Sequence, residues 1–133
     1  MPAADPIADL LAAVKNASVA YLDQARVADS RFKQSVLRVL QADGFIKAFS
    51  VGADKTGRKR LEIHLAYGPK RERLLNGVRR MSKPGRRLYV GVAELKPYLR
   101  QMEVPLLSTP LGILTGAQAY ARKTGGEFLC LVW

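Results

Sequence analysis

The chain has 133 residues and a formal net charge of +11, with 22 Lys and Arg against 11 Asp and Glu. A hydrophobic content of 48% is typical of a folded protein rather than a disordered basic tail, and this length predicts one domain or two small ones. We expect a reduced, intracellular protein, because the sequence contains no membrane-span pattern, no secretory or transit signal, and only one cysteine, Cys130, which excludes a disulfide within the chain.

Two helices are predicted in the first part of the chain. Asp5 is a good N-cap, Pro6 fits the first helical position, and apolar residues at helical spacing extend this helix to residue 16. Ser30 is the predicted cap of a second helix, which Gly44 ends. The apolar stripe predicted for this second helix consists of Phe32, Val36, Val39 and Leu40.

Strands are predicted next. The segment 45–51 and the alternating segment 61–67 predict two β-strands joined by a polar, glycine-containing turn, and the interval between the two helices has room for a short strand. Residues 68–77 are predicted to be a connection. The expected organisation is therefore an N-terminal α/β module over 1–67 and a C-terminal α/β module over 78–133.

The C-terminal module is predicted to contain short elements and tight turns. Segments 78–82 and 86–90 flank Lys83-Pro84-Gly85, whose Pro–Gly order suits a type II turn. The next predicted elements are a short helix over 93–101, strands over 104–109 and 113–115 around Pro110-Leu111-Gly112, and a terminal strand over 127–133. Thr115 and Gln118 fit a capping box for a last helix that runs to Lys123 and stops at Gly125-Gly126.

These elements predict an α/β (α+β) fold. We expect two small α/β modules packed side by side, with mixed or antiparallel strands and helices on one face.

The positive charge is concentrated in the middle of the chain. Between Lys55 and Arg87 there are 12 Lys and Arg against only Glu62 and Glu72, a net charge of +10. Like charges at this density repel one another unless an anion compensates them. We therefore favour a nucleic-acid partner over a face that serves only solubility.

The residues that could support catalysis are scattered. His64 is the single histidine and lies on the polar side of a predicted strand, which favours an ordinary surface residue. Cys130 lies in an apolar strand, where cysteine commonly behaves as a small buried hydrophobe. With no glycine-rich phosphate loop either, we expect no enzyme activity, cofactor, metal or small-molecule substrate.

Three local features suit a nucleic acid, and each has a simpler alternative. The turn at Ser108, Thr109 and Gly112 offers two hydroxyls and a close backbone approach, although it is equally compatible with an ordinary hairpin turn. The segment 82–89 combines three cations with an aromatic ring that could stack on a base or fill the core; these residues are Lys83, Arg86, Arg87 and Tyr89.

The third feature is Gly125-Gly126-Glu127. It could offer backbone N–H groups and a carboxylate that accepts from a base amino group or a 2′-hydroxyl. The simpler alternative is that the glycines only end a helix.

Several short motifs follow one another along essentially the whole chain. They are Asp5–Asp9 with Lys15–Ala17, Ser30–Lys33 with Gly44–Ile46, Ser82–Tyr89, Ser108-Thr109, Gly112–Thr115, Ala119, Gly125–Glu127 and Cys130. In this order and spacing the chain resembles the bacterial-type small-subunit ribosomal protein S8 family. The resemblance implies two α/β domains that bind the central domain of small-subunit ribosomal RNA and support its assembly beside neighbouring small-subunit proteins. Some members also repress translation of their own operon, so the resemblance implies the same additional role as a possibility for this chain.

The resemblance also implies where RNA is contacted. The primary contacts would be Ser108-Thr109 and Gly125-Gly126-Glu127, with Tyr89 and Arg87 alongside. A second RNA-facing patch would consist of Lys15, Asn16 and Lys33.

The chain departs from the family pattern in two places. Pro110-Leu111 stands where members often have Ser followed by Lys or Arg, and Gln101-Met102-Glu103 replaces the usual Gly-Leu-Gly. The first departure removes a hydroxyl and a cation, so we expect this loop to recognise RNA by backbone and shape. We expect the protein in cytoplasmic ribosomes, with an organellar ribosome as the alternative. The rival functions are a nonspecific nucleic-acid-binding protein and an RNA-processing enzyme.

Overall fold

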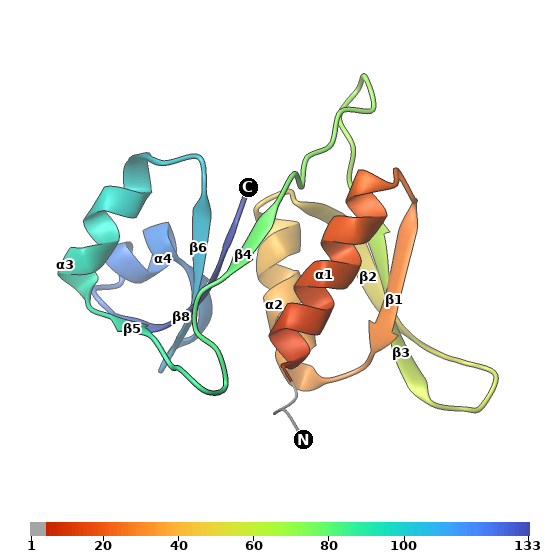
Figure 1. The fold of residues 1–133 in the computed structure, drawn as a ribbon, viewed down its shortest axis with the longest axis horizontal. Helices are drawn as coiled ribbons and strands as arrows, with labels where there is room; N and C mark the ends of the chain where they lie inside the picture. Colours follow the sequence, from red (N-terminus) through yellow and green to blue (C-terminus); the bar gives the residue numbers. More distant parts are fainter. Residues whose placement is uncertain (1–4) are drawn as a thin grey trace. The chain divides into compact units, whose positions relative to one another are not determined.

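A computed structural model describes residues 5–133, and the chain divides into two compact units (Figure 1). Ala8–Asn76 form the N-terminal unit, whereas residues 5–7 and Gly77–Trp133 form the C-terminal unit. The boundary lies at the end of the segment predicted to be a connection. Most of that segment belongs to the N-terminal unit, where Tyr67 and Arg73 form an isolated antiparallel bridge.

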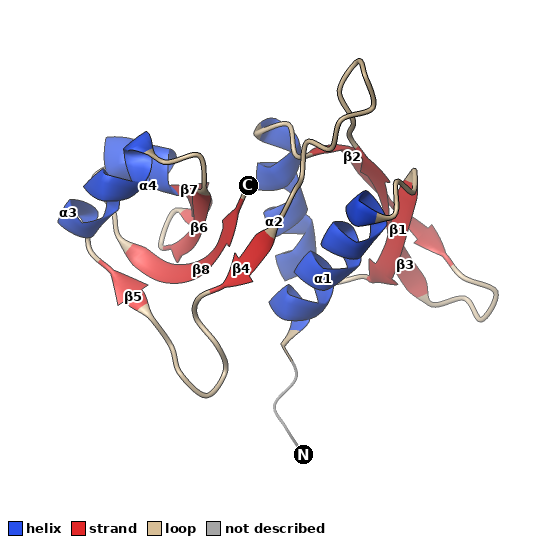
Figure 2. Cartoon of the chain, turned by 45° about the horizontal axis from the view of Figure 1, so that its top comes forward, coloured by secondary structure: helices blue, strands red, loops and turns tan. Residues whose placement is uncertain are grey.

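The N-terminal unit places two helices on one face of a three-stranded antiparallel sheet (Figure 2). Its elements are α1 (Pro6–Val19), β1 (Gln24–Ala28), α2 (Arg31–Ala42), β2 (Ile46–Ala53) and β3 (Lys59–Leu65), with strand order β1-β3-β2. The short strand for which the sequence left room is β1. The predicted class, helices with antiparallel strands in an α+β fold, is confirmed.

Helix α1 buries the apolar residues expected of it. Leu10, Leu11 and Val14 are at most 2% exposed. The helix continues past the predicted end at residue 16, because Ala17 and Ser18 are also buried and the Ser18 hydroxyl donates to the Leu75 carbonyl oxygen at 2.7 Å. Tertiary contacts therefore add the last turn.

Helix α2 has the predicted cap but not the predicted buried stripe. The Ser30 side chain accepts a hydrogen bond from the Lys33 backbone N–H at 3.1 Å, and Gly44 follows the helix with a φ of +83°. Phe32 is 39% exposed, and the buried residues are Lys33, Val36, Leu37 and Leu40. Both sets fit helical spacing, so periodicity alone could not decide between two faces that differ by one residue.

The C-terminal unit is built around its last strand. Its elements are β4 (Val78–Arg80), β5 (Tyr89–Val90), α3 (Val92–Leu95), the 3-10 helix η1 (Lys96–Arg100), β6 (Val104–Thr109), β7 (Gly112–Thr115), α4 (Gly116–Ala121) and β8 (Gly126–Val132). The antiparallel strand order is β4-β8-β6-β7, and β5 also pairs with β8. Leu95, Leu107, Leu114 and Ala119 pack together as a core cluster.

Three local predictions for this unit need correction. The segments that flank Lys83-Pro84-Gly85 do not pair as the two strands of a hairpin. They share only an isolated β-bridge between Lys83 and Arg86, because β4 and β5 both pair with β8. Gly85 lacks the positive φ that a type II turn requires. The helix predicted over 93–101 is split, since Pro97 lies in the first positions of a 3-10 helix rather than inside an α-helix.

The last helix begins as predicted and ends early. Thr115 and Gln118 form the predicted capping box, but α4 stops at Ala121. Lys123 takes the left-handed conformation after the helix, with a φ of 56°. The predicted stop at Gly125-Gly126 is therefore wrong, and these glycines have a different role in the sheet.

Candidate nucleic-acid interface

Three of the predicted site residues lie side by side across strands β5, β8 and β6. Tyr89 is the cross-strand partner of Glu127 on one side, and Ser108 is its partner on the other. Directly opposed residues in antiparallel strands project to the same face, so these side chains form one row. The next residue, Phe128, is buried. Its ring lies edge-on to the ring of Tyr98, with the ring centroids 5.2 Å apart. Strand alternation thus turns Glu127 away from the core.

The Glu127 carboxylate is held by two donors. Its Oε2 accepts a hydrogen bond from the Ser82 hydroxyl at 2.5 Å and another from Arg87 Nη1 at 2.9 Å. The Ser82 oxygen accepts in turn from the Leu88 backbone N–H at 3.1 Å. Burial raises the pKa of Glu127, but the hydrogen bonds from Ser82 and Arg87 outweigh it, so the pKa lies below its usual value. The ionised carboxylate is fixed in place, and the described residues offer no hydrogen bond to its second oxygen.

The β6–β7 turn uses one of its two hydroxyls internally. Thr109 Oγ1 donates to the Gly112 carbonyl oxygen at 2.7 Å and accepts from the Leu111 backbone N–H at 3.1 Å. Gly112 has a φ of +113°, which only glycine adopts easily. The Ser108 hydroxyl has no hydrogen-bond partner among the described residues. The turn therefore presents Ser108 for contact and uses Thr109 to hold its shape.

Gly125 and Gly126 allow neighbouring strands to approach β8 closely. A Cβ atom added to Gly126 would collide with the carbonyl oxygen of Ser108, and one added to Gly125 would collide with that of Val90. Both obstacles are backbone atoms, which cannot rotate away. The glycines thus set the spacing of the strands that carry Ser108, Tyr89 and Glu127.

A group of cations lines a depression of about 400 Å³ next to this row. We call it the basic depression, and it is lined by Arg79, Arg80, Met81, Lys83, Arg86 and Leu88. Arg80 has a carboxylate partner, Asp5, at 3.1 Å. Among the residues that the structure describes, Arg79, Lys83 and Arg86 form no ion pair. Uncompensated cations in a concave surface favour an anionic ligand such as phosphate.

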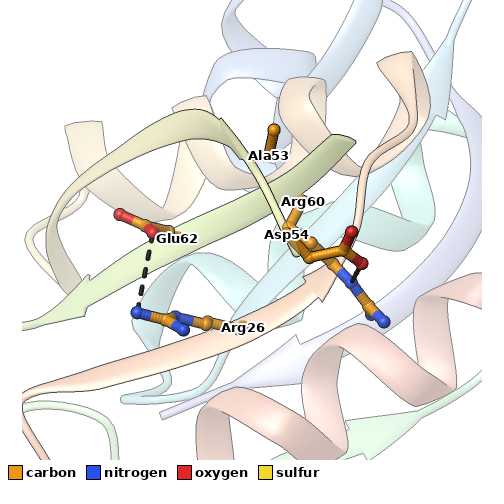
Figure 3. A pocket seen from close by; sticks show the side chains of 5 residues that line it. All are labelled: Arg26, Ala53, Asp54, Arg60 and Glu62. Carbon is orange, nitrogen blue, oxygen red and sulfur yellow. Dashed lines mark hydrogen bonds and ion pairs between the residues drawn. The ribbon is translucent and has the colours of Figure 1, made fainter. Parts of the chain in front are cut away.

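A second depression, in the N-terminal unit, differs in its charge balance (Figure 3). Arg26 Nη2 lies 3.7 Å from Glu62 Oε1, and Arg60 Nε lies 3.3 Å from Asp54 Oδ2. Each arginine that lines it is thus paired with a carboxylate. This makes it a weaker candidate for a phosphate than the basic depression.

The predicted N-terminal patch is divided by the fold. Lys15 and Asn16 are exposed on α1. Lys33 is only 8% exposed, and its Nζ donates to the Ala28 carbonyl oxygen at 3.1 Å. Lys33 thus has a partner inside the protein, which the residue type alone did not indicate.

Sequence reasoning missed two residues of this interface, Ser82 and Arg79. Ser82 is fully buried and fixes Glu127 from 45 positions away, and Arg79 lines the basic depression. Ser82 opens the Ser82–Tyr89 motif of the resemblance, but the sequence predicted no role for it, because its partner is defined only when β8 lies beside the segment after β4. Arg79 lies within the basic stretch between Lys55 and Arg87, so this charge pattern was the signal that could have identified it.

The described residues contain no group of three or more His, Cys, Asp or Glu arranged to hold a metal. Cys130 is fully buried, and burial raises the pKa of its thiol to about 12, which suits the predicted role as a small core residue. Within the part of the chain described, every helix is too short or too polar to cross a membrane.

Comparison with known proteins gives a consistent result. A family model described as ribosomal protein S8 matches residues 5–133. The chain is 44% identical to the small ribosomal subunit protein uS8 of Corynebacterium urealyticum over all of both chains. It is 42% identical to the uS8 protein of Thermus aquaticus, over 97% of this chain and 98% of that one.

Proposed function

The chain belongs to the ribosomal protein S8 family, and on that premise we propose that it is a structural component of the small ribosomal subunit that binds small-subunit ribosomal RNA. Its partners are then that RNA and neighbouring small-subunit proteins, in ribosomes of the cytoplasm. Its role is binding and support of assembly rather than catalysis.

The observation that carries the proposed RNA site is the row of Tyr89, Glu127 and Ser108 beside the basic depression. The row offers an aromatic residue, Tyr89, that is 67% exposed, together with a fixed carboxylate acceptor and a hydroxyl. RNA is commonly recognised through stacking and through hydrogen bonds to base edges and 2′-hydroxyls.

The residues divide into those that contact the RNA and those that shape the site. Arg79, Lys83 and Arg86 contact phosphates and supply affinity, whereas Tyr89, Ser108 and Glu127 supply recognition. The residues that shape the site are Ser82, Arg87, Thr109, Gly112, Gly125 and Gly126. Lys15 and Asn16 can add phosphate or sugar contacts from the N-terminal unit. We leave Lys33 out, because its ammonium group already has the Ala28 carbonyl as a partner.

Binding to a central-domain fragment of small-subunit ribosomal RNA tests the proposal. The fragment should bind much more tightly than duplex DNA of equal length, and it should remain uncleaved and unmodified. Equal affinity for the two nucleic acids would indicate a nonspecific binder, and turnover of the RNA would indicate an enzyme. Co-sedimentation with small ribosomal subunits in high salt is the matching test in the cell extract.

Substitution of Ser108 tests the site itself. Ser108→Ala should weaken binding to the RNA fragment while leaving the unfolding free energy nearly unchanged, because its hydroxyl has no partner among the described residues. Thr109→Ala should weaken binding and also destabilise the turn, since it loses two hydrogen bonds. Unchanged affinity of both variants would place the RNA site elsewhere.

A further inference from the structure

Strand β2 lies at one edge of the sheet in the N-terminal unit. It pairs with β3 on its inner side, and its outer side has no partner strand among the described residues. We call this outer side the β2 edge. An edge strand presents unpaired backbone N–H and C=O groups, with which another extended chain can pair.

Hydrogen bonds at the two ends of β3 show which way its backbone groups point. Asp29 N–H donates to the Lys59 carbonyl oxygen, and Leu65 N–H donates to the Asp23 carbonyl oxygen. Both bonds lie on the side of β1. Because backbone groups alternate along a strand, the odd-numbered residues of β3 bond toward β1 and the even-numbered residues bond toward β2.

The register then divides the residues of β2 into two sets. The residues opposite the even-numbered positions of β3 bond to that strand; they are Ala48, Ser50 and Gly52. The residues between them direct their N–H and C=O groups to the β2 edge; they are Phe49, Val51 and Ala53. Within the described part of the chain, none of these outward groups has a hydrogen-bond partner.

The β2 edge lacks the features that protect the other strand edges described here. β2 has eight residues, of which only Lys47 is charged and none is proline. β1 has five residues with an arginine in the middle, and its outward Ala28 carbonyl oxygen accepts from Lys33 Nζ at 3.1 Å. β7 has only four residues. Short length, charge and cover are the usual protections of an edge, so β2 is the edge best suited to a partner strand.

Val51 provides an apolar contact at this edge. It is the cross-strand partner of Leu61, which is fully buried, but Val51 itself is 48% exposed. The buried layer of the unit therefore remains open beside Val51. A strand added at the β2 edge would place a side chain next to Val51 and extend this layer.

The charges near the β2 edge distinguish between possible occupants. The turn that follows β2 carries Lys55, Arg58 and Lys59, which form no ion pair among the described residues. Antiparallel pairing of two copies through β2 would bring Lys47 of one copy near this turn of the other, and each copy has a net charge of +11. Repulsion therefore opposes a second copy. An RNA can bind the cations of the turn, but it has no alternating N–H and C=O groups with which to pair as a strand.

From the unpaired backbone groups, the exposed Val51 and the cationic turn, we propose that the β2 edge binds an extended segment of a neighbouring small-subunit protein. The segment adds a fourth strand to the sheet, places an apolar side chain beside Val51 and directs an acidic residue toward the turn. That the partner is a small-subunit protein rests on the function proposed above.

Hydrogen exchange of the full chain tests this proposal in three states: free, bound to the central-domain RNA fragment, and within isolated small ribosomal subunits. The rates of individual amides are read by NMR after the exchange is quenched and the protein is extracted. In subunits, the amides of Phe49, Val51 and Ala53 should exchange at least about tenfold more slowly than in the free chain, a factor that corresponds to one added hydrogen bond. The amides that bond to β3 are the internal reference.

The other outcomes identify other occupants. Protection gained with the RNA fragment alone would indicate RNA, and protection in the free chain that rises with protein concentration would indicate a second copy. Either result, or unchanged rates in subunits, would overturn the proposal. Failure to bind the RNA fragment would instead contradict the proposed function, so the two failures are distinguishable.

Proline variants make the test specific. Val51→Pro removes an outward N–H but no bond to β3, and proline is tolerated on that side of an edge strand. It should bind the RNA fragment like the parent but compete at least about fivefold less well for incorporation into small subunits. The matched control is Val51→Thr, which keeps the N–H and the β-branched shape. Ala53→Pro repeats the test at the last residue of β2, and parent-like incorporation of both proline variants would contradict the proposal.

Discussion

Ser82 donates a hydrogen bond of 2.5 Å to Glu127 across 45 positions of sequence, and the same carboxylate oxygen accepts from Arg87. The link fixes an ionised, half-buried carboxylate between the exposed Tyr89 and the half-buried Ser108 on one row of the sheet. Phosphates repel a nearby carboxylate, and hydrogen bonds from RNA donors to the carboxylate would offset this repulsion. Its fixed geometry supports a role as a hydrogen-bond acceptor for RNA.

Ser82→Ala is expected to destabilise the C-terminal unit by about 1–3 kcal/mol, because it removes a donor to Glu127 and leaves the Leu88 N–H without its acceptor. Urea unfolding at neutral pH measures the change. The control is Ser50→Ala, since Ser50 is exposed and its hydroxyl has no partner among the described residues. Equal stability of the two variants would contradict the proposed role of Ser82.

The lowered pKa of Glu127 predicts a pH-dependent contribution to stability. The folded state holds this carboxylate ionised more strongly than the unfolded state does, so the contribution is fully present above the unfolded pKa, near 4.5. It is lost as the pH falls through the lower, folded pKa. Glu127→Gln should remove this component, so that the stability difference between parent and variant shrinks in acid. Denaturant unfolding over a pH series measures it, with Glu103→Gln as the control; a difference that does not change with pH would contradict the assignment.

Gly126→Ala should be poorly tolerated, because the added Cβ would collide with the Ser108 backbone carbonyl. We expect a loss of about 3 kcal/mol, as for other overpacked sites, together with weaker RNA binding as the strands separate. Thermal unfolding measures the loss. Gly85→Ala is a matched control, because no atom lies within 4 Å of its added Cβ and its φ is not positive. If both variants melted alike, close strand approach would not be the reason for Gly126.

The double variant Lys83→Gln/Arg86→Gln tests the basic depression. If each cation contacts one phosphate, the slope of log affinity against log salt should become shallower by about 1.4–1.8. Affinity for all RNA sequences should fall together, since phosphate contacts carry no sequence information. The control for the loss of two positive charges is Arg31→Gln/Arg38→Gln, at two exposed arginines of α2 in the N-terminal unit. An unchanged slope in the double variant would place the phosphates elsewhere.

The local features of this protein can be predicted from its amino-acid sequence. The Ser30 cap, the Thr115–Gln118 capping box and the tight turn before Gly112 each depend on residues within a few positions of one another. Propensity and short-range hydrogen bonds decide such features, so they can be predicted from neighbouring residue types. The buried face of α2 was predicted only in part, because helical spacing fits two adjacent faces.

The way in which these local elements combine into a site depends on strand pairing, which the sequence did not predict. β4 and β5 pair with β8 rather than with each other, and this pairing brings Ser82 to Glu127 and Tyr89 to the same row. It also explains Gly126 as a point of close backbone contact rather than a helix stop. These relationships depend on strand partners far apart in the sequence, and partner choice follows from the packing of the whole unit, not from the residues of any one segment.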